Sequence, residues 1–252
     1  MESVLRYTFF FLRLVNTVKE ELSGNPLTKV GAIIAAAGSG RRMGGVDKAF
    51  AYLNGRPIIS WTVEVFQRCD VIHQIVIVLR EQNLEWGCRL VEEQGWDKVT
   101  EVCAGGCRRQ DSVAVGLSKL IDCDWVVIHD GARPLVSADL VRRGLAEAQD
   151  SGAAVAAVPV KDTIKLSGAD GMVQETLWRQ SLWAVQTPQV FRFDIIAEAY
   201  RQAKDEVTDD AALVEQLGYK VKLHMGSYDN IKVTTPEDLA LAEVLWHRMG
   251  ER

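Results

Sequence analysis

Short apolar runs alternate with segments of helical apolar spacing along most of the chain. The runs that predict strands are residues 30–36, 74–79, 99–103, 125–129, 153–160 and 221–224, and the segments that predict helices are 57–68, 83–94, 111–120, 138–150 and 239–249. Strands that alternate with helices favour a parallel sheet with right-handed crossovers and helices on both faces. We therefore expect an α/β, Rossmann-like, mostly parallel sheet that binds its ligands beyond the carboxyl ends of the strands.

Residues 161–189 interrupt this alternation. Two short strand patterns, Thr163–Leu166 and Met172–Gln174, flank the turn-forming sequence Ser167–Gly171, which predicts a β-hairpin. A hairpin that projects from an α/β sheet has unpaired edges and would expose its tryptophans, which favours a contact with another chain. We therefore expect a projecting β-hairpin arm that contacts a partner.

The N-terminal residues differ in character from the rest. They contain the apolar stretch Tyr7–Leu12, which is too short for a signal-peptide core, is followed by Arg13 and lacks a small-residue cleavage site. The linker sequence Ser23–Pro26 comes next. We therefore expect an N-terminal extension and linker at residues 1–29 and one domain at residues 30–249.

A glycine-rich loop with three cations follows the first predicted strand. Gly38 and Gly40 lie just beyond the end of the strand, where glycines let backbone N–H groups approach an anion. The same loop carries Arg41, Arg42 and Lys48, and cations this close repel one another unless an anion joins them. The loop therefore predicts a binding site for a triphosphate.

Two common phosphate-binding loops do not fit this sequence. The chain contains no Gly-Lys-Ser/Thr and so has no P-loop. The dinucleotide fingerprint requires a third glycine where Met43 stands, and an acidic residue at the end of the second strand, where Arg80 follows instead. These differences argue against a dinucleotide-dependent oxidoreductase.

Chemically useful side chains also follow other predicted elements. Asp130 comes at the end of a strand, where a carboxylate can hold Mg²⁺ over phosphates, although a helix cap or a loop charge would give the same pattern. Gly106 and Ser112 belong to a second glycine turn, which either grips a flat base or only begins a helix. Asp229 and Lys232 lie close together in the sequence and on their own would indicate a surface ion pair.

Composition and charge narrow the class of protein. The 252 residues are 48% hydrophobic, which suits one large α/β domain, and a formal net charge of −5 argues against a nucleic-acid surface. Five cysteines without a C-x-x-C pair favour a reducing compartment and argue against a zinc site. No apolar run approaches the length of a membrane span. We therefore expect a cytoplasmic protein without nucleic-acid or membrane partners.

Six blocks with recognisable motifs occur in order between Val30 and Met249. They are Ala36–Met43, Gly105–Val113, His129–Pro134, Val158–Lys165, Gln186–Gln189 and Asp229–Asp238. In order and spacing they resemble one family, the 2-C-methyl-D-erythritol 4-phosphate cytidylyltransferases of the non-mevalonate isoprenoid route. The resemblance implies a homodimeric nucleotidyltransferase that uses CTP with Mg²⁺ or another divalent cation. Its reaction would transfer CMP from CTP to 2-C-methyl-D-erythritol 4-phosphate and release pyrophosphate.

The resemblance also implies a role for each matching residue. Those that would bind the triphosphate and stabilise the transition state are Arg42, Lys48 and Lys232, and those that would surround the nucleotide are Ala36, Ala37, Gly38, Gly40, Gly106, Ser112 and Asp130. Asp130 would also lie beside the metal ion. Those around the methylerythritol phosphate would be Arg133, Thr163, Arg179, Thr187 and Asp229. Thr163 and Arg179 would reach the site from the arm of the other subunit.

Two positions depart from the pattern of the family. The catalytic lysine reads Asp47-Lys48-Ala49, where the family commonly has proline before it and glutamine after it. Cys107 stands near the base, where a polar or acidic residue is frequent. Neither departure removes a charge that the chemistry requires.

The expected chemistry needs no general base. The attacking phosphate is already an anion, so catalysis consists of alignment and charge neutralisation. His129 could act as a base, but as a lone histidine at the end of a strand it is predicted to be packed and hydrogen-bonded. Two alternatives stay open: a cytidylyltransferase for another polyol phosphate, such as ribitol 5-phosphate, and a nucleotide-binding module without catalysis.

Overall fold

The computed structural model describes residues 28–38 and 48–250. The expected N-terminal extension therefore lies outside the described residues except for its last two positions. Within the two described ranges, no helix is both long and apolar enough to cross a membrane.

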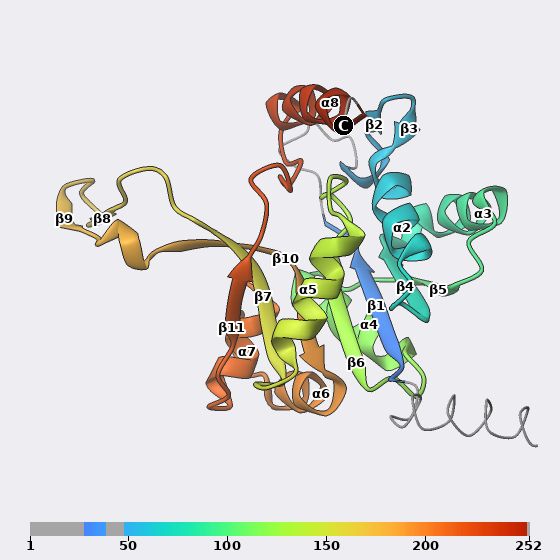
Figure 1. Cartoon of the computed structure of the whole chain (residues 1–252), viewed down its shortest axis with the longest axis horizontal. Coiled ribbons are helices and arrows are strands. Elements are labelled where there is room, and N and C mark those ends of the chain that lie inside the picture. Colours follow the sequence, from blue (N-terminus) through green and yellow to red (C-terminus); the bar gives the residue numbers. More distant parts are fainter. Residues whose placement is uncertain (1–27, 39–47, 251–252) are drawn as a thin grey trace, which may run out of the picture.

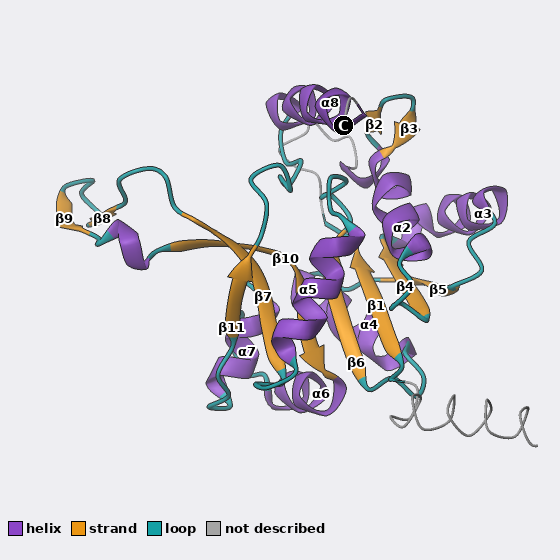
Figure 2. Cartoon of the chain, in the orientation of Figure 1, coloured by secondary structure: helices purple, strands orange, loops and turns teal. Residues whose placement is uncertain are grey.

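A seven-stranded sheet forms the centre of the molecule, with the strand order β11-β7-β10-β6-β1-β4-β5 (Figures 1 and 2). The strands are β1 (Val30–Ala35), β4 (Gln74–Leu79), β5 (Val99–Ala104), β6 (Trp125–Asp130), β7 (Ala153–Pro159), β10 (Trp183–Arg192) and β11 (Lys222–Met225). β10 runs antiparallel to both of its neighbours, and the other pairs are parallel. The prediction of a Rossmann-like, mostly parallel sheet is therefore confirmed.

Helices cover both faces of this sheet. They are α2 (Ile58–Arg68), α3 (Leu84–Gln94), α4 (Arg109–Lys119), α5 (Ala138–Ala148), α6 (Phe193–Gln202) and α7 (Asp210–Gln216), and α8 (Pro236–Gly250) closes the chain. Ala32 and Ile34 of β1 share one core with α2, α3 and α5, whereas Ile33 shares the other with α4, α6 and α7. Successive side chains of a strand point to opposite faces, so a strand covered on both sides reads as one continuous apolar run.

Strand β10 and helices α6 and α7 are absent from the elements that the sequence predicts. In β10, Gln186, Pro188 and Gln189 interrupt the apolar pattern, and the pairing with β7 is irregular between Val185 and Gln189. Proline is tolerated in a sheet at such an irregularity. The sheet therefore includes residues 183–189, and the projecting part of the arm is shorter than the predicted range of 161–189.

The predicted hairpin is present and projects from the sheet (Figure 1). Its strands, β8 (Lys165–Ser167) and β9 (Val173–Thr176), pair antiparallel, and every residue in both is exposed. Met172 is 68% exposed and Trp178 is 70% exposed. The arm thus presents apolar side chains that nothing within the described part of this chain covers.

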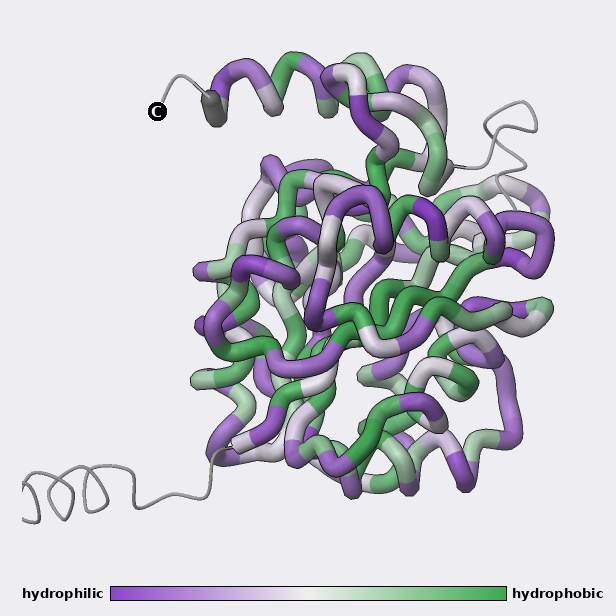
Figure 3. Tube along the Cα trace, turned by 90° about the vertical axis from the view of Figure 1, so that its right-hand side faces the viewer, coloured by the Kyte–Doolittle hydropathy of each residue, from purple (hydrophilic) through white to green (hydrophobic). Residues whose placement is uncertain are grey.

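A small hydrophobic cluster lies apart from the two sheet cores. Its buried members are Ala51, Leu53, Ile58, Val233 and Ala242. Ile58 belongs to α2 and Ala242 to α8, and Val233 lies in the connection between β11 and α8. Ala51 and Leu53 come from the segment that contains η2 (Lys48–Phe50), β2 (Tyr52–Leu53) and β3 (Arg56–Pro57). Figures 1 and 3 show α8 at the top of the molecule, above the body of the sheet. We call these five residues the upper cluster.

Candidate active site

The ends of β1 and β6 create the centre of the site. The two strands are adjacent and parallel, and Ala35 lies opposite Asp130 in the register. The N–H of Gly131 donates a hydrogen bond of 2.9 Å to the carbonyl oxygen of Ala35. A Cβ atom at Gly131 would lie 2.8 Å from the Cβ of Ala36, so only glycine permits this close approach. The backbone therefore brings Asp130 beside the start of the glycine-rich loop.

A pocket of about 680 Å³, part of which is open to solvent, lies at this point. Its walls are formed by Ala35, Ala36, Ala37, Gly38, Ala49, Gly106, Cys107, Arg108, Arg109, Ser112, Asp130, Ala132 and Lys232. The predicted nucleotide-binding residues that the structure describes thus come together around one space. Gly40 and Arg42 lie outside the described residues, and Lys48 is described only as the first residue of η2.

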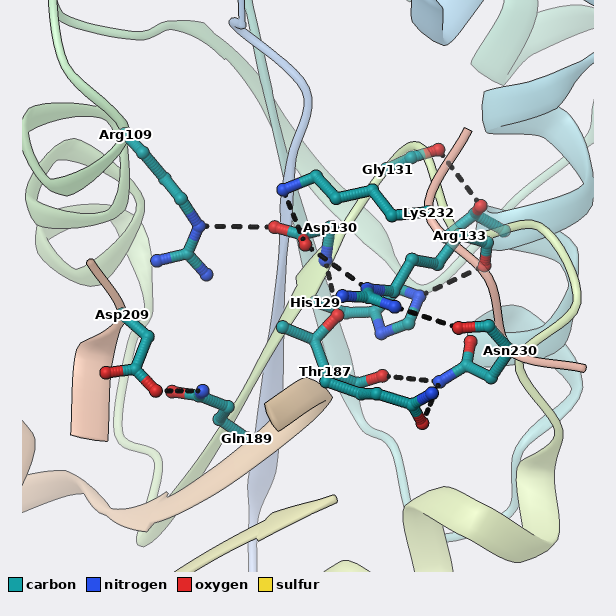
Figure 4. A network of polar contacts seen from close by, with 12 residues as sticks. Arg109, His129, Asp130, Gly131, Arg133, Thr187, Gln189, Asp209, Asn230 and Lys232 are labelled. Atoms are coloured by element: carbon teal, nitrogen blue, oxygen red, sulfur yellow. Dashed lines mark hydrogen bonds and ion pairs between the residues drawn. The ribbon is translucent and has the colours of Figure 1, made fainter. Parts of the chain in front are cut away.

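The Asp130 carboxylate is held by three cations (Figure 4). Its Oδ1 accepts from Arg109 at 3.2 Å, and its Oδ2 lies 2.9 Å from Lys232 Nζ and 3.3 Å from Arg133 Nε. The side chain of Asp130 is only 8% exposed. Burial on its own would raise the pKa of Asp130, but the three cations outweigh it and hold that pKa far below its usual value. The carboxylate therefore stays ionised, and the cations around it exceed its charge.

The second glycine turn forms the opposite wall of the pocket and also begins α4. The N–H of Gly106 donates to Ser112 Oγ at 3.2 Å, and this hydroxyl donates to the carbonyl oxygen of Arg108 at 3.1 Å. A Cβ atom at Gly105 would lie 2.6 Å from that of Ala37. The two interpretations of this turn, pocket wall and helix start, are therefore compatible.

Thr187 and Arg133 lie on another side of Asp130. The backbone N–H of Asp130 donates to Thr187 Oγ1 at 3.0 Å. Asn230 connects the two. Its side-chain Nδ2 donates to the backbone carbonyl of Thr187, and its backbone carbonyl accepts from the Arg133 guanidinium, both at 2.8 Å. The structure thus brings together two predicted substrate residues, and it adds Asn230, to which the sequence analysis assigned no role.

Asp229 and Lys232 do not pair with each other. Lys232 contacts Asp130, whereas Asp229 forms an ion pair with Arg248 of α8. Asp229 and Lys232 therefore do not form the surface ion pair that their spacing on its own indicates. Lys232 belongs to the pocket, and Asp229 contacts the C-terminal helix.

The two predicted residues of the arm, Thr163 and Arg179, are not among the residues that line the pocket of their own chain, and the arm projects away from the sheet (Figure 1). Thr163 and Arg179 are exposed, and the Arg179 guanidinium donates to the carbonyl oxygen of Lys161 at 2.7 Å. The fold of one chain does not bring these side chains to its own Asp130.

His129 is packed and hydrogen-bonded, as predicted. It is fully buried, its ring centroid lies 5.2 Å from that of Phe66, and its Nε2 is 3.2 Å from the Arg133 carbonyl oxygen, to which a neutral ring donates. Burial lowers the pKa of His129 to about 3. The ring is therefore neutral near pH 7 and serves the packing of β6.

The described residues that line the pocket offer a divalent ion one carboxylate, that of Asp130. Among the described residues, no group of three or more His, Cys, Asp or Glu side chains could hold a metal. Asp130 offers one ionised carboxylate at the pocket wall. Mg²⁺ is often held by one or two carboxylates, with phosphates and water as its other ligands. Asp130 therefore fits an ion that arrives with a triphosphate.

The mostly parallel sheet and the cationic pocket between two glycine turns at its strand ends define a nucleotidyltransferase of the α/β class. Residues 30–248 match the family model described as 2-C-methyl-D-erythritol 4-phosphate cytidylyltransferase, and the chain belongs to this family. The resemblance inferred from the six sequence blocks is thereby confirmed.

Relatives and solved structures agree with this assignment. The chain is 54% identical over 217 residues to a 2-C-methyl-D-erythritol 4-phosphate cytidylyltransferase of Dehalococcoides mccartyi, and the match covers 86% of this chain and 96% of that protein. The crystal structure of 4-diphosphocytidyl-2C-methyl-D-erythritol synthase from Anaerococcus prevotii superposes with a TM-score of 0.79 at 30% identity, over 88% of this chain and 97% of the other. The 2-C-methyl-D-erythritol 4-phosphate cytidylyltransferase of Thermus thermophilus gives a TM-score of 0.72 at 35% identity, over 87% and 99%.

Proposed function

We propose that the chain transfers CMP from CTP to 2-C-methyl-D-erythritol 4-phosphate, giving 4-diphosphocytidyl-2-C-methyl-D-erythritol and pyrophosphate. The observation that carries this proposal is the Asp130 carboxylate surrounded by Arg109, Arg133 and Lys232 at the nucleotide pocket. An excess of cations at a pocket with two glycine turns suits a ligand with several negative charges. The proposal also agrees with the family of the chain.

The reaction is an in-line displacement at the α-phosphorus of CTP. The attacking phosphate of the polyol is an anion, so no side chain has to remove a proton. The barrier comes from the approach of two anions and from the charge that builds up on the departing pyrophosphate. Arg42, Lys48 and Lys232 would neutralise this charge and align the two phosphates. The burial of His129 and its low pKa, which make it a poor proton acceptor, agree with a mechanism that has no general base.

A divalent ion bound with CTP would supply further charge neutralisation on the phosphates. Asp130 would hold it from the pocket wall. The Lys232 ammonium, which lies on Asp130 Oδ2 and is partly exposed, would then be available to the phosphates of the substrates.

The polyol phosphate would bind beside Arg133, Thr187 and Asp229, and Thr163 and Arg179 would reach it from the arm of a second copy of the chain. The exposed arm supports this arrangement, because Trp178, Met172 and Val173 are each at least 60% exposed, and apolar surface of this kind indicates an interface. The active unit would be a homodimer, and its substrates are metabolites that suit a cytoplasmic enzyme.

One assay tests the activity. Pyrophosphate release is measured with CTP and, in turn, 2-C-methyl-D-erythritol 4-phosphate and ribitol 5-phosphate. We expect release with the methylerythritol substrate and a much lower kcat/KM with ribitol 5-phosphate. Preference for ribitol 5-phosphate would support the alternative substrate, and CTP binding without release in either reaction would indicate a nucleotide-binding module.

A further inference from the structure

Arg109 joins the pocket to a helix that takes no part in forming it. It is the first residue of α4. Its Nε donates to Asp130 Oδ1 at 3.2 Å, and its terminal nitrogen donates to Asp210 Oδ2 at 2.7 Å. One guanidinium therefore connects β6 with α7.

The Asp210 side chain binds Arg109 and does not cap its own helix, α7. Its side chain is 1% exposed, and the hydroxyl of Tyr200 donates to its other oxygen. The N-cap of α7 is Asp209, which accepts from the N–H of Ala212 at 3.2 Å. A carboxylate that is buried without a counter-charge is costly, so the position of Asp210 depends on its pairing with Arg109.

Helix α7 is itself fixed to the sheet at this point. Gln189 of β10 donates to Asp209 Oδ2 at 2.9 Å (Figure 4), and it accepts from the N–H of Ala211 at 3.1 Å. The start of α7, which contains Asp210, is therefore hydrogen-bonded to β10, and β10 in turn pairs with β6. The arrangement is a closed connection from β6 through Arg109 and α7 back to the sheet.

We propose that Arg109, anchored by Asp210, is a positioning residue that fixes the orientation of the Asp130 carboxylate during nucleotidyl transfer. Arg133 and Lys232 both contact Oδ2 of this carboxylate, and Arg109 alone among the three cations contacts Oδ1. The planar guanidinium can hold two carboxylates at once in fixed directions, which the compact ammonium of lysine cannot do as well. The inference rests on the proposed function, in which Asp130 faces the nucleotide.

The anchor also sets the charge of the pocket. Asp130, Asp210, Arg109, Arg133 and Lys232 together carry a net formal charge of +1. Replacement of Asp210 by Asn raises this charge by one unit and leaves an amide that cannot act as a charged partner for Arg109. Arg109 then becomes free to attract the triphosphate of CTP, while Asp130 loses its fixed orientation.

The test is the steady-state kinetics of Asp210→Asn in the full-length chain, with CTP and the methylerythritol substrate. We expect kcat to fall roughly 10- to 100-fold, as for loss of a group that orients a ligand-binding side chain, while KM for CTP stays unchanged or decreases. The matched control is Asp194→Asn, because Asp194 is also in the first turn of a helix and pairs with an arginine, Arg192, but on the surface. The control should keep wild-type kcat.

A merely structural role would give a different pattern, namely a higher KM for CTP or a loss of activity in proportion to the loss of folded protein in the far-UV circular dichroism. Either pattern, or wild-type kcat, would overturn the inference. A second measurement compares the kcat of Arg109→Lys, of Asp210→Asn and of the variant that carries both changes. If the pair acts as a unit, the double variant is no slower than the slower single variant, whereas losses that multiply would refute it. Activity of the wild type in the same assay separates a failure of this inference from a failure of the proposed function.

Discussion

Asp130 is the residue on which most of the site depends. Its carboxylate lines the pocket and is paired there with three protein cations. Of these, the side chain of Arg133 is 12% exposed and has no other carboxylate within reach among the described residues. The same carboxylate therefore stabilises the fold and presents the cations to the ligand.

We predict that Asp130→Asn lowers both activity and stability. The change leaves the buried Arg133 charge without compensation, which should cost about 3 kcal/mol in the free energy of unfolding. Urea unfolding followed by circular dichroism measures this loss. Asp70→Asn is the control, because Asp70 pairs with an arginine on the surface and should have no measurable effect. Equal stability of Asp130→Asn and the wild type would contradict the account of the cluster.

His129 gives a prediction about pH. Its pKa is about 3 in the folded protein, below the ordinary value of 6.5, so between these values the unfolded chain binds a proton that the folded one does not. Stability should therefore fall as the pH is lowered from 6.5, by up to about 1.4 kcal/mol per pH unit from this residue. His129→Gln keeps a donor for the Arg133 carbonyl but does not titrate.

The measurement is the free energy of unfolding between pH 7 and 5, where carboxyl groups contribute little. The His129→Gln variant should show a flatter dependence on pH than the wild type. His247→Gln, at an exposed position of α8, should keep the wild-type slope. If the His129 variant and the wild type have parallel curves, the histidine is not the source of the acid sensitivity.

At the scale of elements, α8 organises one side of the site. Trp246 of α8 packs against Trp61 of α2 in a tilted arrangement, with ring centroids 4.0 Å apart and an interplanar angle of 47°, and Ala242 is buried in the upper cluster. Val233 belongs to the same cluster and directly follows Lys232 in the chain. The cluster also contains Ala51, three residues after Lys48. The backbone of both predicted catalytic lysines is thus tied to one small core.

We predict that Trp246→Ala lowers kcat through the loss of this core. The variant removes the contact with Trp61 and should destabilise the docking of α8 by about 2 kcal/mol, less than for a fully buried aromatic side chain. Hydrogen exchange should accelerate in α8 and around Lys232, and kcat should fall. Val244→Ala, at a position of α8 that is 66% exposed, is the control. Faster exchange in α8 with unchanged kcat would show that the helix does not hold Lys232.

The sequence predicted the elements in which apolar runs and helical spacing were clear. β1 and β4 have uninterrupted apolar runs because both of their faces are buried, and they were predicted within one residue of their ends. β10 was missed because two glutamines and a proline interrupt its apolar pattern. The glutamine side chains bond to other segments of the chain, and the pairing with β7 is irregular at this point. The turn chemistry predicted the hairpin, but it could not indicate where the returning strand enters the sheet.

The same contrast holds for the site. Asp130 and the first glycine loop could be placed together from the sequence, because the ends of parallel strands meet at one edge of a sheet. The pairing of Arg109 with Asp210 could not, because 101 residues separate them and α7 was not predicted. The glycine turn drew attention to Arg109, but nothing local indicated which carboxylates it would meet.

At the scale of the whole molecule, the arm decides whether one chain has a complete site. Thr163 and Arg179 belong to the arm and are exposed, whereas Thr187 and Arg133 contact Asp130 at the end of β6. If the arm completes the site of a second copy, each active site contains residues of both chains. The dimer would then be the catalytic unit.

We predict that Arg179→Ala and Lys48→Ala, each inactive alone, restore activity when they exchange subunits. In the mixed dimer one site carries both changes and the other carries neither, so up to half of the sites of the mixed dimers are intact. The rate of pyrophosphate release after mixing measures the rescue, and light scattering verifies that dimers have formed. Mixed dimers no more active than their parents would place Arg179 in the site of its own chain.

The central claim is that the cations of this pocket carry out nucleotidyl transfer without a general base. Lys232 tests it most directly, because its side chain is the most exposed of the three cations on Asp130, and Arg109 and Arg133 would still compensate Asp130 in its absence. The measurement is kcat for pyrophosphate release from CTP and 2-C-methyl-D-erythritol 4-phosphate by Lys232→Ala, with Lys204→Ala, an exposed lysine, as the control. We predict a loss of about 10²–10³ in kcat for Lys232→Ala with the fold intact, and wild-type activity for the control. A folded Lys232→Ala enzyme with wild-type kcat would contradict the account.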